Sequence, residues 1–220
     1  EIGVKAQPTR NIALGLTVYN TDVNDYQAQV QAADLSVNRG YLANAEKIRV
    51  RGVEFDANLR LGSFFSLYGA LAYTDGKYVS FTNAPPPLEE TGGPTFKDIS
   101  GGQLPGISKW AASFGGEANT RPNTFLGNDG SFFFAIDGFY RSSFSSNPSP
   151  SKYLVVDGYA LVNARAGFRA SSGASVYLWT RNAFNQNYFE QLLPGAGNAG
   201  HYAGVLGDPR TYGVTLRYAF

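Results

Sequence analysis

The clearest structural signal is a run of ten residues, Thr211-Tyr212-Gly213-Val214-Thr215-Leu216-Arg217-Tyr218-Ala219-Phe220. From Tyr212 to Phe220 every second residue is apolar or aromatic. The residues between them are small or polar, and one of them is Arg217. Successive side chains of a strand point to opposite faces. The run therefore predicts a β-strand with one apolar and one polar face.

The same period of two recurs along the chain. From Val53 to Leu61 apolar residues alternate with Glu54, Asp56 and Arg60, and a similar alternation begins at Trp110. Such alternation over long segments indicates strands rather than helices. The pattern predicts nine strands, at about 1–7, 11–31, 46–61, 65–80, 107–120, 131–144, 153–170, 174–190 and 208–220.

The connections between these strands alternate in length. Short ones are expected at 8–10, 62–63 and 171–173, with a longer one that ends in the turn signal Asn128-Asp129-Gly130. Long ones are expected near 32–45, 81–106, 145–152 and 191–207. Short turns at one rim and long loops at the other are typical of an outer-membrane β-barrel.

Composition agrees with an all-β chain. Gly is 26, Tyr 14 and Phe 16, whereas Cys and Met are absent and charged residues make up 16%. The absence of Cys excludes disulfides and thiol chemistry, and a net charge of +1 offers no basic field for nucleic acid. No apolar run approaches the roughly 18 residues of a membrane helix. Because the first residues lack a basic start and an apolar stretch, we expect a mature or truncated chain.

Alternation alone does not separate a membrane barrel from a soluble β-sandwich, because both have an apolar face. Three features favour the barrel: strands of ten residues or more, aromatic residues near strand ends, and charges held within strands on the opposite face. The residues expected to point into lipid are Val53, Phe55, Leu59, Trp110, Phe114, Val214, Leu216 and Tyr218.

The sequence offers little for catalysis or metal binding. His201 is the only histidine, and it lies in a Gly-rich stretch without a nucleophile motif. A calcium loop starting at Asp22 fails at Gln27 and Ala33, where Gly and Glu are required. We therefore expect no catalytic residue, metal or cofactor. The charged residues expected to form an ionic network facing the barrel lumen are Glu54, Asp56, Arg60, Glu117 and Arg217.

Ligand capture is expected in the long loops, because loops carry most binding residues and aromatic platforms suit many small molecules. The candidates are Tyr41, Asn44, Phe81, Phe96, Lys97, Asp98, Asn147, His201 and Tyr202.

Four segments, in order along the chain, resemble motifs of TonB-dependent receptors. The first is R-x-x-G-x-E at 49–54, and the second is the proline-containing approach to a strand at 103–110. The third, at 182–188, is similar to N-L-F-D-x-x-Y, with Ala183 and Asn185 in place of Leu and Asp. The fourth is G-x-P-R-x-x-G at 207–213.

This resemblance implies an all-β fold, an antiparallel transmembrane β-barrel in which residues 1–220 form about nine C-terminal strands of a 22-stranded wall. The plug domain and the TonB-interacting segment would lie outside this chain. Tyr218 and Phe220 resemble the terminal aromatic signal by which the barrel-assembly machinery recognises outer-membrane proteins. Further expected partners are outer-membrane lipid and lipopolysaccharide, the remaining strands and plug, the TonB complex and a small-molecule ligand.

The expected function is active transport across the bacterial outer membrane of a scarce nutrient, such as a siderophore or a saccharide, with energy supplied through TonB. Two alternatives stay open. One is a small self-contained outer-membrane barrel with a structural or adhesive role, and the other is a soluble β-sandwich binding module.

Overall fold

The computed structural model describes residues 1–31, 40–90, 92–195 and 200–219. Within these ranges the chain is all-β, apart from one short 3-10 helix at Leu88–Glu90. Ten strands form one antiparallel sheet, in the order β1-β2-β3-β4-β5-β7-β10-β11-β14 with β6 beside β7. The strands of this sheet are β1 (Ile2–Thr9), β2 (Ile12–Gln31), β3 (Gly40–Leu61), β4 (Phe65–Ser80), β5 (Trp110–Asn119), β6 (Asn123–Phe125), β7 (Asn128–Arg141), β10 (Tyr159–Ala170), β11 (Ala174–Arg181) and β14 (Thr211–Tyr218). Two small two-stranded sheets pair β8 (Phe144–Ser145) with β9 (Val155–Val156) and β12 (Phe189–Pro194) with β13 (Tyr202–Leu206).

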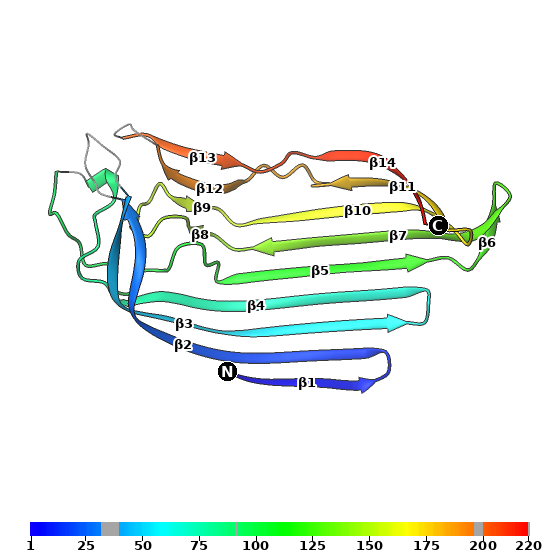
Figure 1. Cartoon of the computed structure of the whole chain (residues 1–220), viewed down its shortest axis with the longest axis horizontal. Helices are drawn as coiled ribbons and strands as arrows, with labels where there is room; N and C mark the ends of the chain where they lie inside the picture. The colour runs from blue at the N-terminus through cyan, green and yellow to red at the C-terminus, as the bar shows by residue number, and fades with distance from the viewer. Residues whose placement is uncertain (32–39, 91, 196–199, 220) are drawn as a thin grey trace.

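The long strands run side by side along the long axis of the molecule (Figure 1). The long connections gather at one end, on the left of the view, and the short turns at the other. The nine strands on the main path of the sheet correspond in order to the nine predicted from the period of two. No helix among the described residues is long and apolar enough to cross a membrane.

The sheet is open, with β1 at one edge and β14 at the other. In a self-contained barrel these two strands would pair with each other, because a lipid-exposed edge leaves backbone groups unsatisfied. Here each of them pairs with one neighbour in the sheet, β2 or β11. The prediction of an incomplete section of a larger barrel wall is confirmed. The alternative of a small self-contained barrel requires β1 to pair with β14, and these strands do not pair.

The pairing register gives the sheet one apolar face, because cross-strand partners point to the same side. Leu16, Phe55, Leu71, Ala112 and Tyr140 form one continuous row across five strands. All eight residues predicted to face lipid lie on this side, which we call the apolar face.

The height of the apolar face fits a membrane. From Trp110 to Ala118, strand β5 extends about 27 Å at about 3.4 Å per residue. At a tilt of about 40° that is about 21 Å along the membrane normal, close to the roughly 25 Å band of such barrels. The Tyr73 and Trp110 rings, with centroids 4.9 Å apart, lie where the apolar face ends.

The opposite side, which we call the polar face, carries the charges. The residues predicted to face the lumen, Glu54, Asp56, Arg60, Glu117 and Arg217, all fall on this side. Glu117 forms an ion pair with Arg169 at 3.2 Å and lies 3.9 Å from Arg165. That this face lines the lumen of a complete barrel stays a prediction.

Strand β11 ends earlier than expected. The sequence predicts one strand over 174–190, but β11 stops at Arg181 and β12 begins only at Phe189. Asn182 and Asn185 adopt positive φ angles of 47° and 52°, which asparagine tolerates and a strand does not. The buried Asn182 amide donates to the carbonyl oxygens of Gln186 and Asp208, at 2.9 and 3.0 Å. The asparagine of the 182–188 motif thus closes a compact turn.

The turn predicted at Asn128-Asp129-Gly130 is two residues out of place. The hairpin turn is formed by Leu126 and Gly127, both at positive φ, and residues 128–130 belong to β7. Asn128 pairs with Phe125 across the turn. The polar tripeptide therefore starts a strand.

Other predicted boundaries also shift. The strand predicted at 46–61 begins at Gly40, because its pairing with β2 continues to Gln31. The strands predicted at 131–144 and 153–170 each break near the long-loop end, into β7 and β8 and into β9 and β10. The strand predicted at 208–220 begins at Thr211, after β13 and an irregular segment.

Candidate functional site

Three long connections meet at one end of the sheet, and we call them together the loop layer. They join β4 to β5, β7 to β10 and β11 to β14. In Figure 1 they lie at the left end, and the small sheets β8-β9 and β12-β13 belong to the second and third of them.

A hydrophobic core attaches the first connection to the strands. Phe81 is fully buried and packs against Tyr78, with ring centroids 5.1 Å apart. Leu104 and Ile107 lie over Gly76 on the continuation of the polar face, where a Cβ on Gly76 would come within 2.4 Å of Ile107. The members of this cluster are Ala28, Val30, Ala45, Ile48, Tyr78, Phe81, Ala84, Ile99 and Leu104. The loop is therefore folded onto the sheet.

A second cluster holds the other two connections. Phe144, Val156 and Tyr159 are buried together, and Tyr188 and Leu192 pack against them. The Tyr159 and Tyr188 rings have centroids 4.4 Å apart. The last connection thereby packs on β9 and β10 through aromatic contacts.

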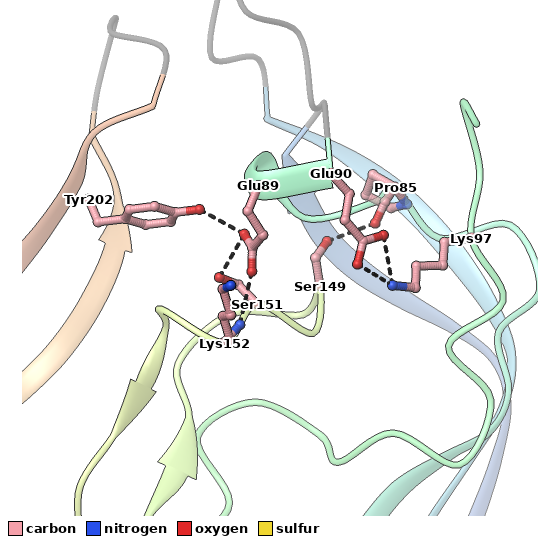
Figure 2. Close-up of polar contacts among 8 residues, drawn as sticks. All are labelled: Pro85, Glu89, Glu90, Lys97, Ser149, Ser151, Lys152 and Tyr202. Carbon is pink, nitrogen blue, oxygen red and sulfur yellow. Dashed lines mark hydrogen bonds and ion pairs between the residues drawn. The ribbon is translucent and has the colours of Figure 1, made fainter. Parts of the chain in front are cut away.

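Glu89 joins all three connections. Its carboxylate accepts hydrogen bonds from the Tyr202 hydroxyl at 2.7 Å, the Ser151 hydroxyl at 3.0 Å and the backbone N–H of Lys152 at 2.9 Å. Figure 2 shows these groups converging on one side chain, which we call the Glu89 junction. A carboxylate that accepts three hydrogen bonds binds its donors strongly only while it is ionised.

The protonation states at the junction follow from its contacts. Partial burial opposes ionisation of Glu89, but the hydrogen bonds from Tyr202, Ser151 and Lys152 outweigh it and hold the pKa of Glu89 below its ordinary value. Burial and the hydrogen bond to Glu89 raise the pKa of Tyr202 to about 12. At neutral pH the junction is therefore a carboxylate facing a neutral phenol.

An exposed aromatic surface lies beside the junction. The Tyr153 ring is 50% exposed and lies 5.1 Å from the Tyr202 ring, and the Lys152 ammonium sits 4.9 Å from the Tyr153 ring centroid. Two phenol rings with an adjacent cation can stack on a flat organic molecule and neutralise an anionic one. We call Lys152, Tyr153 and Tyr202 the capture surface.

Farther along the first connection, polar contacts hold the chain around the short helix. The Lys97 ammonium contacts both Glu90 carboxylate oxygens, at 2.5 and 2.7 Å, and the buried Ser149 hydroxyl donates to the Pro85 carbonyl at 3.0 Å (Figure 2). The first contact lies within the β4–β5 connection, and the second joins it to the β7–β10 connection independently of Glu89.

The structure places the predicted loop candidates in different environments. Tyr41 and Asn44 lie on β3, paired with Val30 and Gln27, and not in a loop as predicted. Phe81 is inside the core and has no surface to offer a ligand in this structure.

The other candidates do lie in the loop layer. Phe96 is 54% exposed, whereas Lys97 is occupied by Glu90. The Ser100 hydroxyl and amide hold the pKa of Asp98 below its ordinary value. Asn147 accepts the N–H of Ser149 at 2.9 Å. His201 is exposed. Its neighbour Tyr202 is the only one of the predicted candidates that belongs to the capture surface.

Sequence reasoning missed Glu89, Ser151, Lys152 and Tyr153 as site residues. Tyr153 was assigned to a strand, and nothing in the sequence signals that Glu89 meets residues from two later connections. A Pro-rich stretch, Pro85-Pro86-Pro87, directly before Glu89 was the available sign of a fixed loop.

A recess of about 640 Å³ lies on the polar face close to the first connection. Its lining includes Glu54, Asp56, Ser108, Arg141 and the apolar Ile107. Among the described residues, neither Glu54 nor Asp56 has a charged partner within ion-pair distance. The recess therefore holds two carboxylates and one arginine, with a net negative charge.

Comparison with known proteins agrees with this architecture. The family model of the TonB dependent receptor-like β-barrel matches residues 1–183. The ferrichrome outer membrane transporter/phage receptor of Escherichia coli (strain K12) is 30% identical over 194 residues, which are 86% of this chain and 22% of that protein.

Solved structures show the same fold. The ferric yersiniabactin uptake receptor FyuA from Yersinia pestis is similar with a TM-score of 0.75 and 16% identity, over 99% of this chain and 29% of that one. The copper transporter OprC has a TM-score of 0.67 and 18% identity, over 99% of this chain and 30% of that one. The chain thus spans less than a third of the length of these relatives. It belongs to the TonB-dependent receptor β-barrels, a family of bacterial outer-membrane receptors and transporters and not of enzymes.

Proposed function

We propose that this chain is part of the barrel wall and of the ligand-capturing loop layer of an outer-membrane receptor that imports a metal chelate, with energy supplied through TonB. The observation that carries the proposal is the capture surface, in which the exposed Tyr153, the half-buried Tyr202 and a lysine lie together at the loop end of a TonB-dependent receptor wall. The named relatives include a ferrichrome transporter and a ferric yersiniabactin receptor.

The chemistry of the loops fits a chelate of the siderophore class. Such molecules combine flat or ring-shaped organic parts with oxygen-rich, frequently anionic groups. The Tyr153 and Tyr202 rings supply stacking surface, and Lys152 supplies a positive charge, so both parts have a partner. A saccharide would use the rings but gain little from the lysine.

The two faces of the sheet suggest the partners of the wall. The apolar face would contact lipid and, at its outer end, lipopolysaccharide, and further strands of the receptor would pair with β1 and β14. The polar face would line the lumen, and the acidic recess near Glu54 would contact the plug domain on which TonB acts. Residues 1–220 would then be one continuous part of the barrel domain.

Assembly gives Tyr218 a second expected role. It lies on the apolar face and is 63% exposed, as a residue that contacts the barrel-assembly machinery must be. Phe220, the other half of the proposed assembly signal, lies outside the described residues.

Uptake of radioactive iron by cells that express the intact receptor as their sole ferric-chelate receptor tests the proposal. We expect uptake of a ferric hydroxamate or catecholate that stops when a protonophore collapses the proton-motive force. Uptake that continues with the protonophore would disprove energy coupling, and uptake of copper but not iron would change the ligand.

Binding to purified receptor tests the capture surface separately. Tyr153→Ala should weaken chelate binding roughly two- to tenfold, the effect of losing one aromatic contact. Phe64→Ala, at an exposed aromatic in a short turn at the other rim, is the matched control and should not change the affinity. Equal affinities of the two variants and the parent would place the ligand elsewhere.

A further inference from the structure

The β6–β7 hairpin carries an unexpected residue at its tip. Its two-residue turn consists of Leu126 and Gly127, with φ angles of 49° and 76°. Positive φ at both positions strongly favours Asn-Gly in such turns, and the left-handed conformation is sterically disfavoured for leucine. Leucine is thus a poor choice for the turn itself.

An exposed leucine side chain at this position is also unfavourable if the turn is surrounded by water. The Leu126 side chain is 84% exposed, more than any other large hydrophobic residue among those described. Single exposed leucines are common on proteins, so exposure by itself indicates nothing. The surroundings of Leu126 are what matter.

An aromatic cluster lies directly below the tip. The Phe125, Phe132 and Phe168 rings contact one another with centroids 5.1 to 5.4 Å apart. Phe132 pairs with Phe168, which pairs with Val176, so these residues belong to a row of the apolar face. The hairpin tip thereby continues the apolar face at the rim of the short turns.

Leu126 shares a groove with that face. The groove has a volume of about 430 Å³, and its apolar lining includes Phe125, Leu126, Phe168, Val176 and Leu216. Asn128, Ser175 and Arg217 also line it, and no acidic residue does. In Figure 1 the hairpin leans at the right toward the ends of β10, β11 and β14, as these shared residues require.

We propose that the tip of the β6–β7 hairpin is inserted in the periplasmic leaflet of the outer membrane, where the groove beneath Leu126 holds an acyl chain of a phospholipid. The groove is continuous with the apolar face, so its occupant is the lipid that this face contacts. Asn128, which lies on the same side of β7 as Phe132, can donate to the polar ester groups of the same molecule. The inference rests on the proposed contact of the apolar face with lipid.

Site-directed spin labelling of the intact receptor in phosphatidylcholine vesicles tests this placement. A nitroxide is attached at Leu126→Cys, at Phe114→Cys on the apolar face and at Ser172→Cys in another turn of the same rim. This chain has no cysteine of its own, and any in the rest of the receptor would be replaced. We expect the label at 126 to collide with dissolved oxygen several-fold more than with a water-soluble nickel chelate, as at 114, and the label at 172 to show the reverse.

The outcomes separate this inference from the proposed function. If the label at position 126 collides mainly with the nickel chelate, like the label at 172, while the label at 114 collides mainly with oxygen, the hairpin is not inserted in lipid. The barrel assignment would stay intact. A label at 126 shielded from both reagents would mean that another segment of the receptor fills the groove. A label at 114 open to the nickel chelate would overturn the facing of the sheet itself.

Leu126→Asn gives a second test that needs no label. Asparagine suits the turn better than leucine, so a tip in water predicts a higher folded fraction in urea titrations of refolding into vesicles. A tip in lipid predicts a lower folded fraction, because the amide loses hydration there. A rise in the folded fraction would therefore contradict the proposal.

Discussion

Strands β3 and β4 pass through two regions in which their faces have opposite chemistry. Between the turn at 62–64 and the level of Val53 and Tyr73, the apolar face is hydrophobic and the polar face carries Glu54 and Asp56. Beyond that level the continuation of the apolar face carries Arg49, Arg51, Asp75 and Lys77. On the other side Val50, Ile48 and Tyr78 are covered by the first connection.

The pairing of the strands is continuous through this change, so the backbone does not cause it. On the proposed facing of the sheet, what changes is the surroundings: the apolar side would pass from lipid to water, and the polar side from the lumen to a protein core. The level between Gly52 and Val53 would then mark the outer membrane surface on these strands. A Cβ on Gly52 would come within 2.6 Å of the Tyr19 hydroxyl, so the motif glycine leaves room for this ring to reach the Thr74 hydroxyl, 2.9 Å away on the next strand.

The largest expected effect is in the protein core of the outer region. Phe81→Ala should destabilise the packing of the first connection by about 3 to 5 kcal/mol, because it leaves a cavity beside Tyr78. Hydrogen exchange of amides in 81–109 measures this loss directly. Phe96→Ala, an exposed phenylalanine in the same connection, should change it by less than about 0.5 kcal/mol. Equal effects would show that Phe81 is not a core residue.

The next effect is in the membrane region. Phe114→Arg should destabilise the folded barrel by about 2 to 4 kcal/mol, because Phe114 lies near the middle of the apolar face. Ser113→Arg, one residue away on the polar face, should be mild. Urea titrations of refolding into vesicles measure both variants. A greater loss for Ser113→Arg would reverse the assignment of the two faces.

The sequence predicted the membrane region well, because lipid imposes one rule on every strand. Along each strand apolar residues had to alternate with polar ones. The eight residues expected on the apolar face could therefore be identified from this two-residue period alone. The number of long strands followed for the same reason.

The outer region was predicted less well, because a folded loop obeys no period. Phe81 and Tyr202 looked alike as loop aromatics, yet one is in the core and the other donates to Glu89. Contacts between connections far apart in the sequence decide these roles. The break at Asn182 depends in the same way on a side-chain amide that reaches Asp208.

A smaller effect is expected at the Glu89 junction, and it depends on pH. Because the pKa of Glu89 is lowered in the folded chain, its stabilisation is present above the ordinary carboxyl pKa and is lost as pH falls through the lowered value. The exposed setting limits it to about 1 kcal/mol or less. Hydrogen exchange in 182–195 should therefore accelerate at acidic pH, after correction for the intrinsic rate.

Two variants isolate the junction. Glu89→Gln should show faster exchange near neutral pH and no further acceleration from this site on acidification. Tyr202→Phe should keep the pH dependence but reduce its size, because the donors from Ser151 and Lys152 remain. At the alkaline end, the contribution of Tyr202 should be lost as pH rises through about 12, since its pKa is raised. If hydrogen exchange in Glu89→Gln still accelerates at acidic pH as in the parent, the pH dependence belongs to a group other than Glu89.

The smallest effect is expected for a charge just outside the membrane boundary. Arg51 contacts Asp75 at 3.1 Å on the continuation of the apolar face, and the Arg51 side chain is 54% exposed. Arg51→Leu should therefore change stability by less than about 1 kcal/mol, and the difference should shrink at high salt. The same urea titration measures it, with Asp75→Asn as the matched variant that removes the other partner. If the boundary lies between Gly52 and Val53, leucine gains no lipid contact at position 51, and the two variants have similar small effects. Clear stabilisation by Arg51→Leu alone would move the boundary outward by at least one pair of residues, because only contact with lipid would favour the leucine there.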